Sequence, residues 1–576
     1  MRNFFKHLGA YRRESILGPL FKLLEATLEL IVPLVIARII DKGIGGSDYG
    51  YVTRMCLILV LLGAVGLAFS VTAQYFAAKA SVGFTAKVRG ELFSHMQKFS
   101  YSDIDELGSS GMITKLTADS EKVQSGLNLA LRLLLRSPFV VFGAMIMAFT
   151  VDVRSALTFV AVIPALAVVV FGIMLITMPL YKRVQAGLDR VLKMTRETIS
   201  GVRVIRAFGK QEDEIADFRA ENERLTATSK RVGHISSLMN PLTYVIINVG
   251  IIALINIGAI RVYEDPSLTQ GEVVALYNYM SQILVELIKL ANLIISITKA
   301  LASASRIEAV LEKEPSQTFG TVDSPEEKGE YALEFLGAAL RYHGVGEDAI
   351  SGIDLKVRHG ETLGVIGGTG SGKTSLVNLI PRFYDATSGE VRVNGVNVKD
   401  YTEEGLRKRI ACVPQKAVLF RGTLRDNLKW GNASATDEEL LYAADTAEAA
   451  KVVEEKGGLD AVIEQGGKNL SGGQRQRLTV ARALARKPEI LILDDSSSAL
   501  DYATDAALRA KIRERVKDTT VVIVSQRASS VMHADKIIVL EDGEAVGIGT
   551  HDELLGSCEV YREIYESQFG EVTHGV

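Results

Sequence analysis

The sequence predicts a membrane domain of six transmembrane helices followed by an α/β domain. Three observations support this fold class: six apolar runs of spanning length, basic segments on only one side of those runs, and short β-rich runs alternating with helical stretches after residue 331. The chain has 576 residues, enough for two to four domains, and 48% of them are hydrophobic. This share fits a membrane part joined to a soluble part.

Each apolar run is close to the length of about 20 residues that a helix needs to cross a bilayer. The runs lie near residues 16–40, 56–78, 129–150, 155–179, 238–262 and 272–303. The links near 41–53, 151–154 and 263–270 are short and poor in Lys and Arg, whereas residues 181–232 are rich in both. The positive-inside bias therefore places residues 181–232 and both termini in the cytosol, with the lipid bilayer as an expected partner.

The two inner links consist mostly of good helix formers, so we expect the spans to continue as long helices into the cytosol. The breaks near 99–105 and after Gly201 predict short crosswise helices that can touch the C-terminal domain; ordinary solvated helix is the alternative. The predicted boundaries are a membrane domain over residues 1–311, a polar linker with two prolines over 312–330, and the α/β domain over 331–576.

Charge and cysteine usage exclude several classes of protein. The net charge of −3 does not indicate a nucleic-acid partner. Cys56, Cys412 and Cys558 lie far apart without a CxxC pair, so we expect neither a disulfide framework nor a zinc site. The N-terminal stretch MRNFFKHLGAYRRES lacks the features of a signal peptide and is expected to form an amphipathic helix.

The strongest motif is a glycine-rich loop that matches GxxxxGK[ST]. The loop follows the strand-like TLGVI and precedes the helical TSLVNLI, which is the setting that a phosphate loop requires and a chance glycine-rich turn lacks. Backbone N–H groups and the helix N-terminus would bind phosphates, Lys373 would reach the β- and γ-phosphates, and Thr374 would offer its hydroxyl to Mg²⁺. The predicted ATP-binding residues here are Gly367, Gly368, Thr369, Gly370, Ser371, Gly372, Lys373, Thr374 and Ser375.

A second motif is the apolar run ILIL, which ends in Asp494 and Asp495. Asp494 is expected to hold Mg²⁺ through water, and Asp495 stands where a base can orient the attacking water. A surface strand that ends in two acids is the alternative.

The third motif is LSGGQ, in which Leu470 precedes Ser471, Gly472, Gly473 and Gln474 at the start of an amphipathic helix. Such a start makes a second anion-binding helix terminus. Because one phosphate loop cannot use both termini, we expect this one to serve a nucleotide held by another copy of the domain.

With these motifs in this order and spacing, the chain resembles ABC exporter half-transporters along nearly its whole length. The resemblance implies a P-loop NTPase domain after a six-span membrane domain of ABC exporter type. It also implies that Gln415 is the Q-loop residue that senses Mg²⁺, that Tyr342 stacks on adenine, and that Ser498 to Asp501 form the D-loop. In this family the chains dimerise, and each ATP lies between the phosphate loop of one domain and the LSGGQ segment of the other.

Two positions depart from the family pattern. The family's catalytic Glu is replaced by Asp495, whose carboxylate reaches about 1.5 Å less, and a misplaced general base loses roughly 10²–10⁴ in rate. The family's switch histidine is replaced by Gln526, which can donate a hydrogen bond but never carries a charge. All phosphate-binding elements are kept, so we predict a site that holds ATP and hydrolyses it slowly.

This pattern, with the tail YREIYESQFG, resembles the degenerate-site subunit of heterodimeric bacterial multidrug exporters. The resemblance implies a partner half-transporter with an intact catalytic Glu and switch His, in a bacterial inner membrane. The alternatives are a homodimer that tolerates Asp495 as its base and a laboratory mutation.

Polar residues in the predicted spans leave two interpretations open. Glu25 and Glu29 can meet a cationic substrate, since intramembrane acids often mark functional sites, or they can pair with Lys22 or with Arg132 and Arg136. On the sixth run, helical spacing places Tyr279, Gln282 and Glu286 on one face. That face either lines a cavity or packs against other helices.

The leading functional hypothesis is ATP-driven export of a small molecule: a drug-like compound, a lipid or a peptide. An ATP-gated channel or regulatory subunit is a second hypothesis, and it differs in that no substrate accumulates against a gradient. An importer of the same fold is a third, but no substrate-binding domain is visible in the sequence. The six spans exclude a soluble ABC protein of DNA repair or translation.

Overall fold

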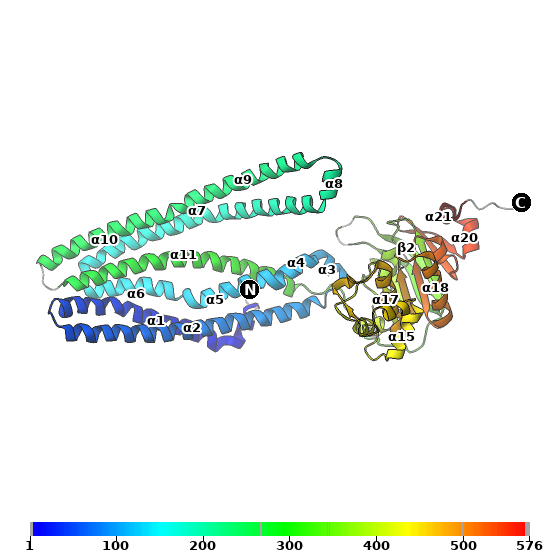
Figure 1. The fold of residues 1–576 in the computed structure, drawn as a ribbon, viewed down its shortest axis with the longest axis horizontal. Helices are drawn as coiled ribbons and strands as arrows, with labels where there is room; N and C mark the ends of the chain where they lie inside the picture. The colour runs from blue at the N-terminus through cyan, green and yellow to red at the C-terminus, as the bar shows by residue number, and fades with distance from the viewer. Residues whose placement is uncertain (1–3, 265–267, 343, 345, 497–498, 571–576) are drawn as a thin grey trace. The chain divides into compact units, whose positions relative to one another are not determined.

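The computed structural model describes residues 4–264, 268–342, 344, 346–496 and 499–570 (Figure 1). The chain forms two compact units. The first comprises Met1–Gln97 and Ser110–Lys313, and the second comprises Lys98–Ser109 and Glu314–Val576. The segment Lys98–Ser109 thus groups with the C-terminal unit, although it lies within the predicted membrane domain of residues 1–311.

In its described residues, the first unit consists of helices joined by short turns and contains no strands. After the 3₁₀ helix Phe4–Tyr11 come α1 (Arg12–Arg38), α2 (Tyr49–Met96), α4 (Ser109–Thr114), α5 (Ser120–Leu133), α6 (Arg136–Val151), α7 (Val153–Ser200), α8 (Val202–Ala207), α9 (Gln211–Ser237), α10 (Met239–Glu264) and α11 (Gln270–Glu312). Short π-helical segments, Ile39–Ile44 and Lys115–Asp119, continue α1 and α4.

The long helices extend well beyond the thickness of a membrane, as the composition of the inner links predicts. α2 and α7 each have 48 residues. At 1.5 Å per residue each is about 72 Å long, against a hydrocarbon core of about 30 Å. α7 ends before Gly201 and the short α8 follows at the predicted break, after which α9 returns alongside α7 (Figure 1).

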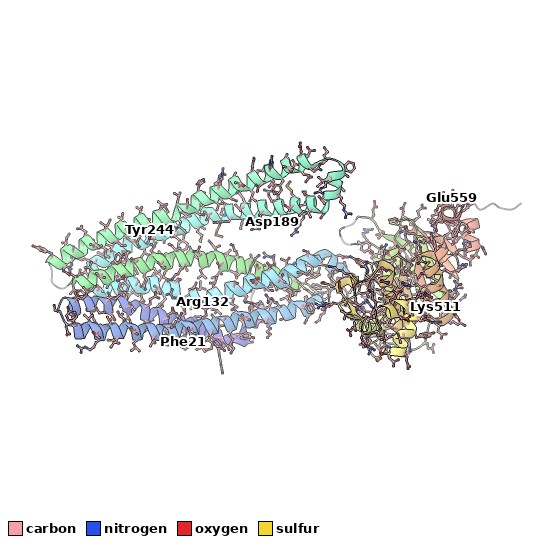
Figure 2. The ribbon with its side chains drawn as sticks, in the orientation of Figure 1. Phe21, Arg132, Asp189, Tyr244, Lys511 and Glu559 are labelled. Carbon is pink, nitrogen blue, oxygen red and sulfur yellow. The ribbon has the colours of Figure 1, made fainter. Side chains whose placement is uncertain are left out.

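Five helical segments in the described residues are long and apolar enough to cross a membrane: Tyr49–Met96, Ser109–Val151, Val153–Ser200, Gln211–Tyr263 and Gln270–Glu312. They correspond to five of the six predicted spans. The first predicted span, α1, has 27 residues but carries Lys22, Glu25 and Glu29 in its central part. α1 nevertheless packs along α2, and Phe21 of α1 is labelled in Figure 2. The Phe21 ring stacks on the ring of Phe76 of α2, with centroids 6.2 Å apart.

The second unit contains a six-stranded sheet in the order β12-β11-β3-β10-β9-β6, parallel except for β12. Its strands are β3 (Thr362–Gly367), β6 (Ile410–Val413), β9 (Ile490–Asp494), β10 (Thr520–Val524), β11 (Lys536–Glu541) and β12 (Glu544–Gly549). An antiparallel sheet in the order β2-β1-β4-β5 contains β1 (Tyr331–Leu340), β2 (Ile350–Arg358), β4 (Ser388–Val393) and β5 (Val396–Asn397). A small pair joins β7 (Gly422–Thr423) to β8 (Val462–Ile463).

Helices surround these sheets. They are α3 (Tyr101–Leu107), α12 (Lys373–Asn378), α13 (Glu403–Arg409), α14 (Leu424–Lys429), α15 (Asp437–Thr446), α16 (Ala450–Glu455), α17 (Gly472–Ala485), α18 (Tyr502–Arg515), α19 (Ala528–Val531), α20 (His551–Ser557) and α21 (Glu559–Phe569). All five residues of β9 are buried, as expected for a central strand of a parallel sheet covered on both faces. The alternating β and α pattern in the sequence therefore predicts this unit correctly.

The predicted linker is bound to the second unit along its length. α11 runs to Glu312 and β1 begins at Tyr331, so the segment of residues 313–330 connects them. The N–H of Gly320 donates to the carbonyl of Tyr401 (2.9 Å), and the N–H of Val322 donates to the carbonyl of Asp400 (3.0 Å). These bonds satisfy backbone groups and hold the segment against the sheet.

Candidate nucleotide-binding site

The carboxyl ends of three neighbouring parallel strands, β3, β10 and β9, meet at one edge of the six-stranded sheet. Loops at this edge form a cleft, the usual place for a ligand in an open α/β sheet. The cleft is lined by Tyr342, Ala349, Thr369, Gly370, Gly372, Lys373, Thr374, Ser375, Gln415, Asp494, Asp495, Val524 and Gln526. The fold thus brings together the Asp pair, Gln415, Gln526, Tyr342 and six of the nine predicted phosphate-loop residues; the other three, Gly367, Gly368 and Ser371, do not line the cleft.

The phosphate loop needs glycine at specific positions. Gly370 and Gly372 have φ of +86° and +91°, a region that other residues rarely adopt. A Cβ on Gly372 would lie 2.5 Å from the carbonyl oxygen of Ala349, and one on Gly367 would lie 2.1 Å from that of Leu540. Gly368, in contrast, faces open space. The loop is therefore shaped by its glycines, and its N–H groups can approach a ligand closely.

Lys373 supplies a positive charge inside the loop. Its ammonium donates to the carbonyl of Gly367 (2.9 Å), to the carbonyl of Gly368 and to the hydroxyl of Ser371 (3.3 Å). The side chain is buried, and burial lowers the pKa of the ammonium. A cation held next to a glycine loop and a helix N-terminus gives the site a strong preference for anions.

Thr374 and Asp494 form a pair of oxygen ligands beside the loop. The Thr374 hydroxyl donates to Asp494 Oδ1 (3.2 Å), and Asp494 is buried at the end of β9. Burial raises the pKa of this carboxyl, and the neighbouring charge of Asp495 acts in the same direction. A bound cation would relieve this cost, so the pair fits Mg²⁺.

The described residues contain no group of three or more His, Cys, Asp or Glu side chains placed to hold a metal ion. A Mg²⁺ at Thr374 and Asp494 would therefore need further oxygens from the nucleotide and from water, which is the usual arrangement for this ion in phosphate sites.

Gln415 contacts Asp495, a pairing that the sequence did not reveal. Gln415 Nε2 donates to Asp495 Oδ2 (3.2 Å) from the loop after β6. Asp495 itself has φ of +44°, an uncommon conformation for a residue with a side chain, and its N–H donates to the carbonyl of Val524 (3.0 Å). Gln415 was predicted to sense Mg²⁺, and here its amide is directed to the residue beside Asp494.

Gln526 follows β10 in an exposed loop that lines the cleft. The loop is held by Gln568 of α21: Gln568 Nε2 donates to the carbonyl of Gln526, and the N–H of Ala528 donates to Gln568 Oε1, both at 2.9 Å. The tail that contains Gln568 stood out in the sequence only as a similarity to other subunits. Its contact with this loop is set by packing and has no local sequence signal.

Tyr342 is among the residues that line the cleft. Its hydroxyl donates to Ser375 Oγ (3.0 Å), and its ring packs edge-to-face on Tyr384, with centroids 5.0 Å apart and planes at 88°. Tyr384 was not predicted; the aromatic pair Phe383–Tyr384 after α12 was its only sign in the sequence. His343 of the LRYHG fragment and Ser498 of the D-loop lie outside the described residues.

The LSGGQ segment forms the start of α17 and does not line this cleft. Ser471 Oγ accepts from the N–H of Gln474 (3.2 Å), and the N–H of Ser471 donates to Gln474 Oε1 (3.0 Å). This capping box satisfies the N–H of Gln474, the third residue of the helix. The N–H groups of the first two residues, Gly472 and Gly473, are not bound by the cap. Buried Leu470 anchors the segment in the core. None of the described residues that line the cleft comes from this segment.

In the membrane unit, the acids of α1 are paired. Arg136 donates to Glu29 (2.5 Å) and to Glu286 (2.7 Å), and Lys22 pairs with Glu25 (2.5 Å). These bonds join α1 to α6 and α11 and explain how α1 carries charges within an apolar bundle. Both acids are paired, with Arg136 rather than Arg132 as the partner of Glu29, and Glu29 also lines a cavity.

The polar face of α11 divides between packing and a cavity. Tyr279 is fully buried, and its hydroxyl donates to the carbonyl of Leu30 (2.6 Å). Gln282 and Glu286 line a cavity between α1 and α11. The other lining residues are Glu29, Val32, Pro33, Ile36, Asn278, Ser281, Val285 and Lys289.

Comparisons with known proteins match both parts of the chain. Residues 15–287 match the family described as ABC transporter transmembrane region, and residues 350–498 match the family described as ABC transporter. The chain is 34% identical, over 99% of both sequences, to the uncharacterized ABC transporter ATP-binding protein YfiB of Bacillus subtilis. It is 27% identical, over 95% of this chain and 94% of the relative, to the ATP-dependent lipid A-core flippase of Vibrio vulnificus.

A solved structure shows the same fold. It is described as a bacterial Atm1-family ABC exporter with ATP bound, and it superposes with a TM-score of 0.79 at 21% identity. The match covers 97% of this chain and 99% of that chain.

Proposed function

The chain belongs to the ABC transporter family and has the exporter fold, and from this premise we propose that it is the slowly hydrolysing subunit of a heterodimeric exporter. Family and fold support ATP hydrolysis coupled to export by a dimer in a membrane. The observation that supports the finer proposal is that one cleft is lined by Lys373, Thr374 and Asp494, which are expected to bind phosphate and Mg²⁺, and also by Asp495 and Gln526 at the two positions that depart from the family pattern.

The cleft keeps what ATP binding requires. Lys373 and the loop N–H groups would bind the phosphates, and Tyr342 would stack on the base. Thr374 and Asp494 would hold Mg²⁺, which neutralises charge on the phosphates when it is bound. The nucleotide should therefore bind to this chain with ordinary affinity.

The cleft is poorly equipped for hydrolysis. The Asp495 carboxylate is one methylene shorter than a glutamate and accepts a hydrogen bond from Gln415, so a water in front of the γ-phosphate would be oriented poorly. Gln526 can donate to a phosphate but cannot supply the charge of a protonated histidine. Both changes slow the chemical step and leave binding intact.

The LSGGQ segment then serves the other site of the dimer. The N–H groups of Gly472 and Gly473 would approach the ATP that the partner subunit binds, since the capping box leaves these two donors unbound. The partner would supply the catalytic Glu and the switch His of that faster site.

The membrane cavity supports a cargo with charged and apolar parts. Its walls combine the apolar Val32 and Val285 with the charged Glu29, Glu286 and Lys289. Drug-like compounds, lipids and peptides all meet this description, and a relative named as a lipid A-core flippase is consistent with an amphiphilic cargo.

The competing proposal is a homodimer in which Asp495 is the working base, because Asp495 does line the cleft. Substituting Asp495→Asn in the chain, co-expressed with its partner half-transporter, separates the two. In the heterodimer most ATPase activity and transport should remain, because the fast site uses the partner's base. An activity loss of roughly a hundredfold or more, the scale of a lost general base, would show that Asp495 is that base.

The neighbouring aspartate provides a matched control. Asp494→Asn removes a carboxylate of the same size from the same strand end, but it is expected to weaken Mg²⁺-dependent ATP binding to this chain. The two variants together show whether each acid acts in binding or in chemistry.

A further inference from the structure

The short helix α3 is fixed to the C-terminal unit at two places. At the first, the buried carboxylate of Asp103 accepts from the N–H (3.1 Å) and hydroxyl (2.9 Å) of Ser100, and from the N–H (2.9 Å) and hydroxyl (3.0 Å) of Ser316. At the second, the Tyr384 hydroxyl donates to Asp105 Oδ2 (2.6 Å). The ring of Tyr101 also lies 4.7 Å from that of Phe383.

Tyr384 contacts a residue that lines the nucleotide cleft as well as a residue of α3. Its ring meets the ring of Tyr342 edge-to-face at 5.0 Å, and Tyr342 lines the cleft and bonds to Ser375 of the phosphate-loop helix. Tyr384 therefore links the ring expected to carry the base to a hydrogen bond on α3.

The turn that carries Tyr384 is firmly held. Arg382 is buried with φ of +54°, its guanidinium bonds to Asp385 (2.6 and 3.1 Å) and to the carbonyl of Thr318 (3.0 Å), and it lies over the ring of Phe319. Because the backbone is fixed, a change at Tyr342 acts on the side chain of Tyr384. Burial and the bond to Asp105 raise the pKa of the Tyr384 hydroxyl, so it remains a neutral donor.

We propose that Tyr384 is a positioning residue that transmits occupation of the base-stacking Tyr342 to α3. The proposal deepens the proposed function and depends on its assignment of the cleft to ATP. A base stacked on Tyr342 fixes that ring, and the edge-to-face contact then fixes the ring of Tyr384. The bond from Tyr384 to Asp105 then favours one position of α3, which lies in the chain between α2 and α4 of the membrane unit.

The test must distinguish an effect of the bound base from an effect of the bound phosphates, because α12 also connects the phosphate loop to the turn that carries Tyr384. Hydrogen exchange in the segment Lys98–Ser109 is measured on the full-length chain in lipid nanodiscs, with MgATP or with Mg-tripolyphosphate, which lacks a base. We expect MgATP to slow exchange in α3 more than tripolyphosphate does at equal occupancy.

Variants identify the hydroxyl as the link. Tyr384→Phe keeps the ring against Tyr342 but removes the bond to Asp105, and it should speed α3 exchange in MgATP about fivefold, as expected for one lost hydrogen bond. ATP affinity, followed with a fluorescent ATP analogue, should stay unchanged. Asp105→Asn keeps an acceptor oxygen and should retain the ATP-specific slowing, whereas Asp105→Ala should lose it.

Three results would overturn the proposal. Equal slowing by tripolyphosphate and MgATP would assign the signal to the phosphates. An ATP-specific slowing that survives in Tyr384→Phe would remove the hydroxyl from the route. If Tyr384→Phe speeds hydrogen exchange in α3 by the same factor with and without nucleotide, the bond from Tyr384 to Asp105 is purely structural.

The failure of the underlying assignment has a different signature. If the wild-type chain does not bind MgATP, or if Tyr342→Leu binds it as tightly as the wild type, the assignment of the cleft or of the base-stacking ring is wrong. The slow hydrolysis in the proposed function is tested independently with Asp495→Asn.

Discussion

Replacing Gly473 at the start of α17 by aspartate is expected to nearly abolish ATP hydrolysis by the assembled exporter, although this chain's own phosphate loop remains intact. The N–H groups of Gly472 and Gly473 are the donors that the capping box of Ser471 leaves unbound. In the proposed dimer these donors face the γ-phosphate of the ATP in the only fast site.

The structure sets the size of the effect. A Cβ on Gly473 would lie 3.0 Å from the carbonyl oxygen of Ala499 and 3.5 Å from Leu500, so a side chain there must displace its neighbours or project toward the ligand. Loss of one aligned donor to a developing charge costs about 10²–10³ in rate. The carboxylate adds repulsion to the phosphate. It does not destabilise α17 itself, because acids are favourable at a helix N-terminus.

The assay compares ATPase rates of co-expressed heterodimers, with assembly checked by gel filtration and nucleotide binding to this chain followed separately. Gly556→Asp is the matched control: Gly556 is exposed in α20, and a Cβ there meets nothing within 4 Å. We expect the control to keep full activity, and Gly473→Asp to retain ATP binding in this chain's own cleft.

One comparison would refute the reasoning. If Gly473→Asp keeps full activity while Asp495→Asn loses it, this chain's cleft is the working site and the assignment of roles across the dimer is reversed. A loss in Gly556→Asp equal to that in Gly473→Asp would also contradict a specific role for the α17 terminus.

Three further predictions follow from the two units. The purified lone chain should bind MgATP but turn over far more slowly than the median enzyme rate of about 10 s⁻¹, and a rate of several per second would contradict the degenerate site. Lowering the pH should weaken Mg²⁺-dependent ATP binding, and the loss should begin at a higher pH than it would with an aspartate of ordinary pKa. The reason is that burial raises the pKa of Asp494, and the protonated carboxyl does not bind the ion. ATP affinity measured against pH without Mg²⁺ is the control. Arg136→Met should destabilise the membrane unit by up to about 3–5 kcal/mol, because it takes the cation away from Glu29 and leaves the buried Glu286 with Lys289 as its remaining cation; a melting temperature no lower than that of Lys289→Met, which removes a half-exposed cation from the same group, would contradict this account.

The fold was predictable because its signals are local. Apolar runs of spanning length, helix formers in the inner links and short β-rich runs each reflect neighbouring residues, and the structure has helices and strands where they were expected. α1 is the exception in composition. The acid Glu29 of α1 is neutralised by Arg136, which lies 107 positions away in the sequence, so its presence in a span could not be explained from local sequence.

Most residues that line the nucleotide cleft belong to motifs visible in the sequence, but Ala349, Val524 and the contacts among the lining residues were not predictable from it. Gln415 and Asp495 are 80 positions apart, and Tyr384 and Asp105 are 279 apart, so tertiary packing alone brings each pair together. On α11, helical spacing put Tyr279 and Glu286 on the same face, but spacing does not say which part of a face is packed. Only neighbouring helices decide that one of these side chains is sealed in the bundle and the other lines a cavity.

The contact of α21 with the loop of Gln526 has a practical consequence for anyone who purifies this protein. Gln568 precedes Phe569, the last residue of the helix, and its amide bonds to both the Gln526 carbonyl and the Ala528 N–H. An affinity tag or fluorescent protein fused at residue 570 would directly follow a helix whose final turn supports a loop of the ATP site, and it could disturb that support. Kinetic comparisons between subunits are therefore cleaner when the fusion is placed elsewhere or is cleaved before the assay.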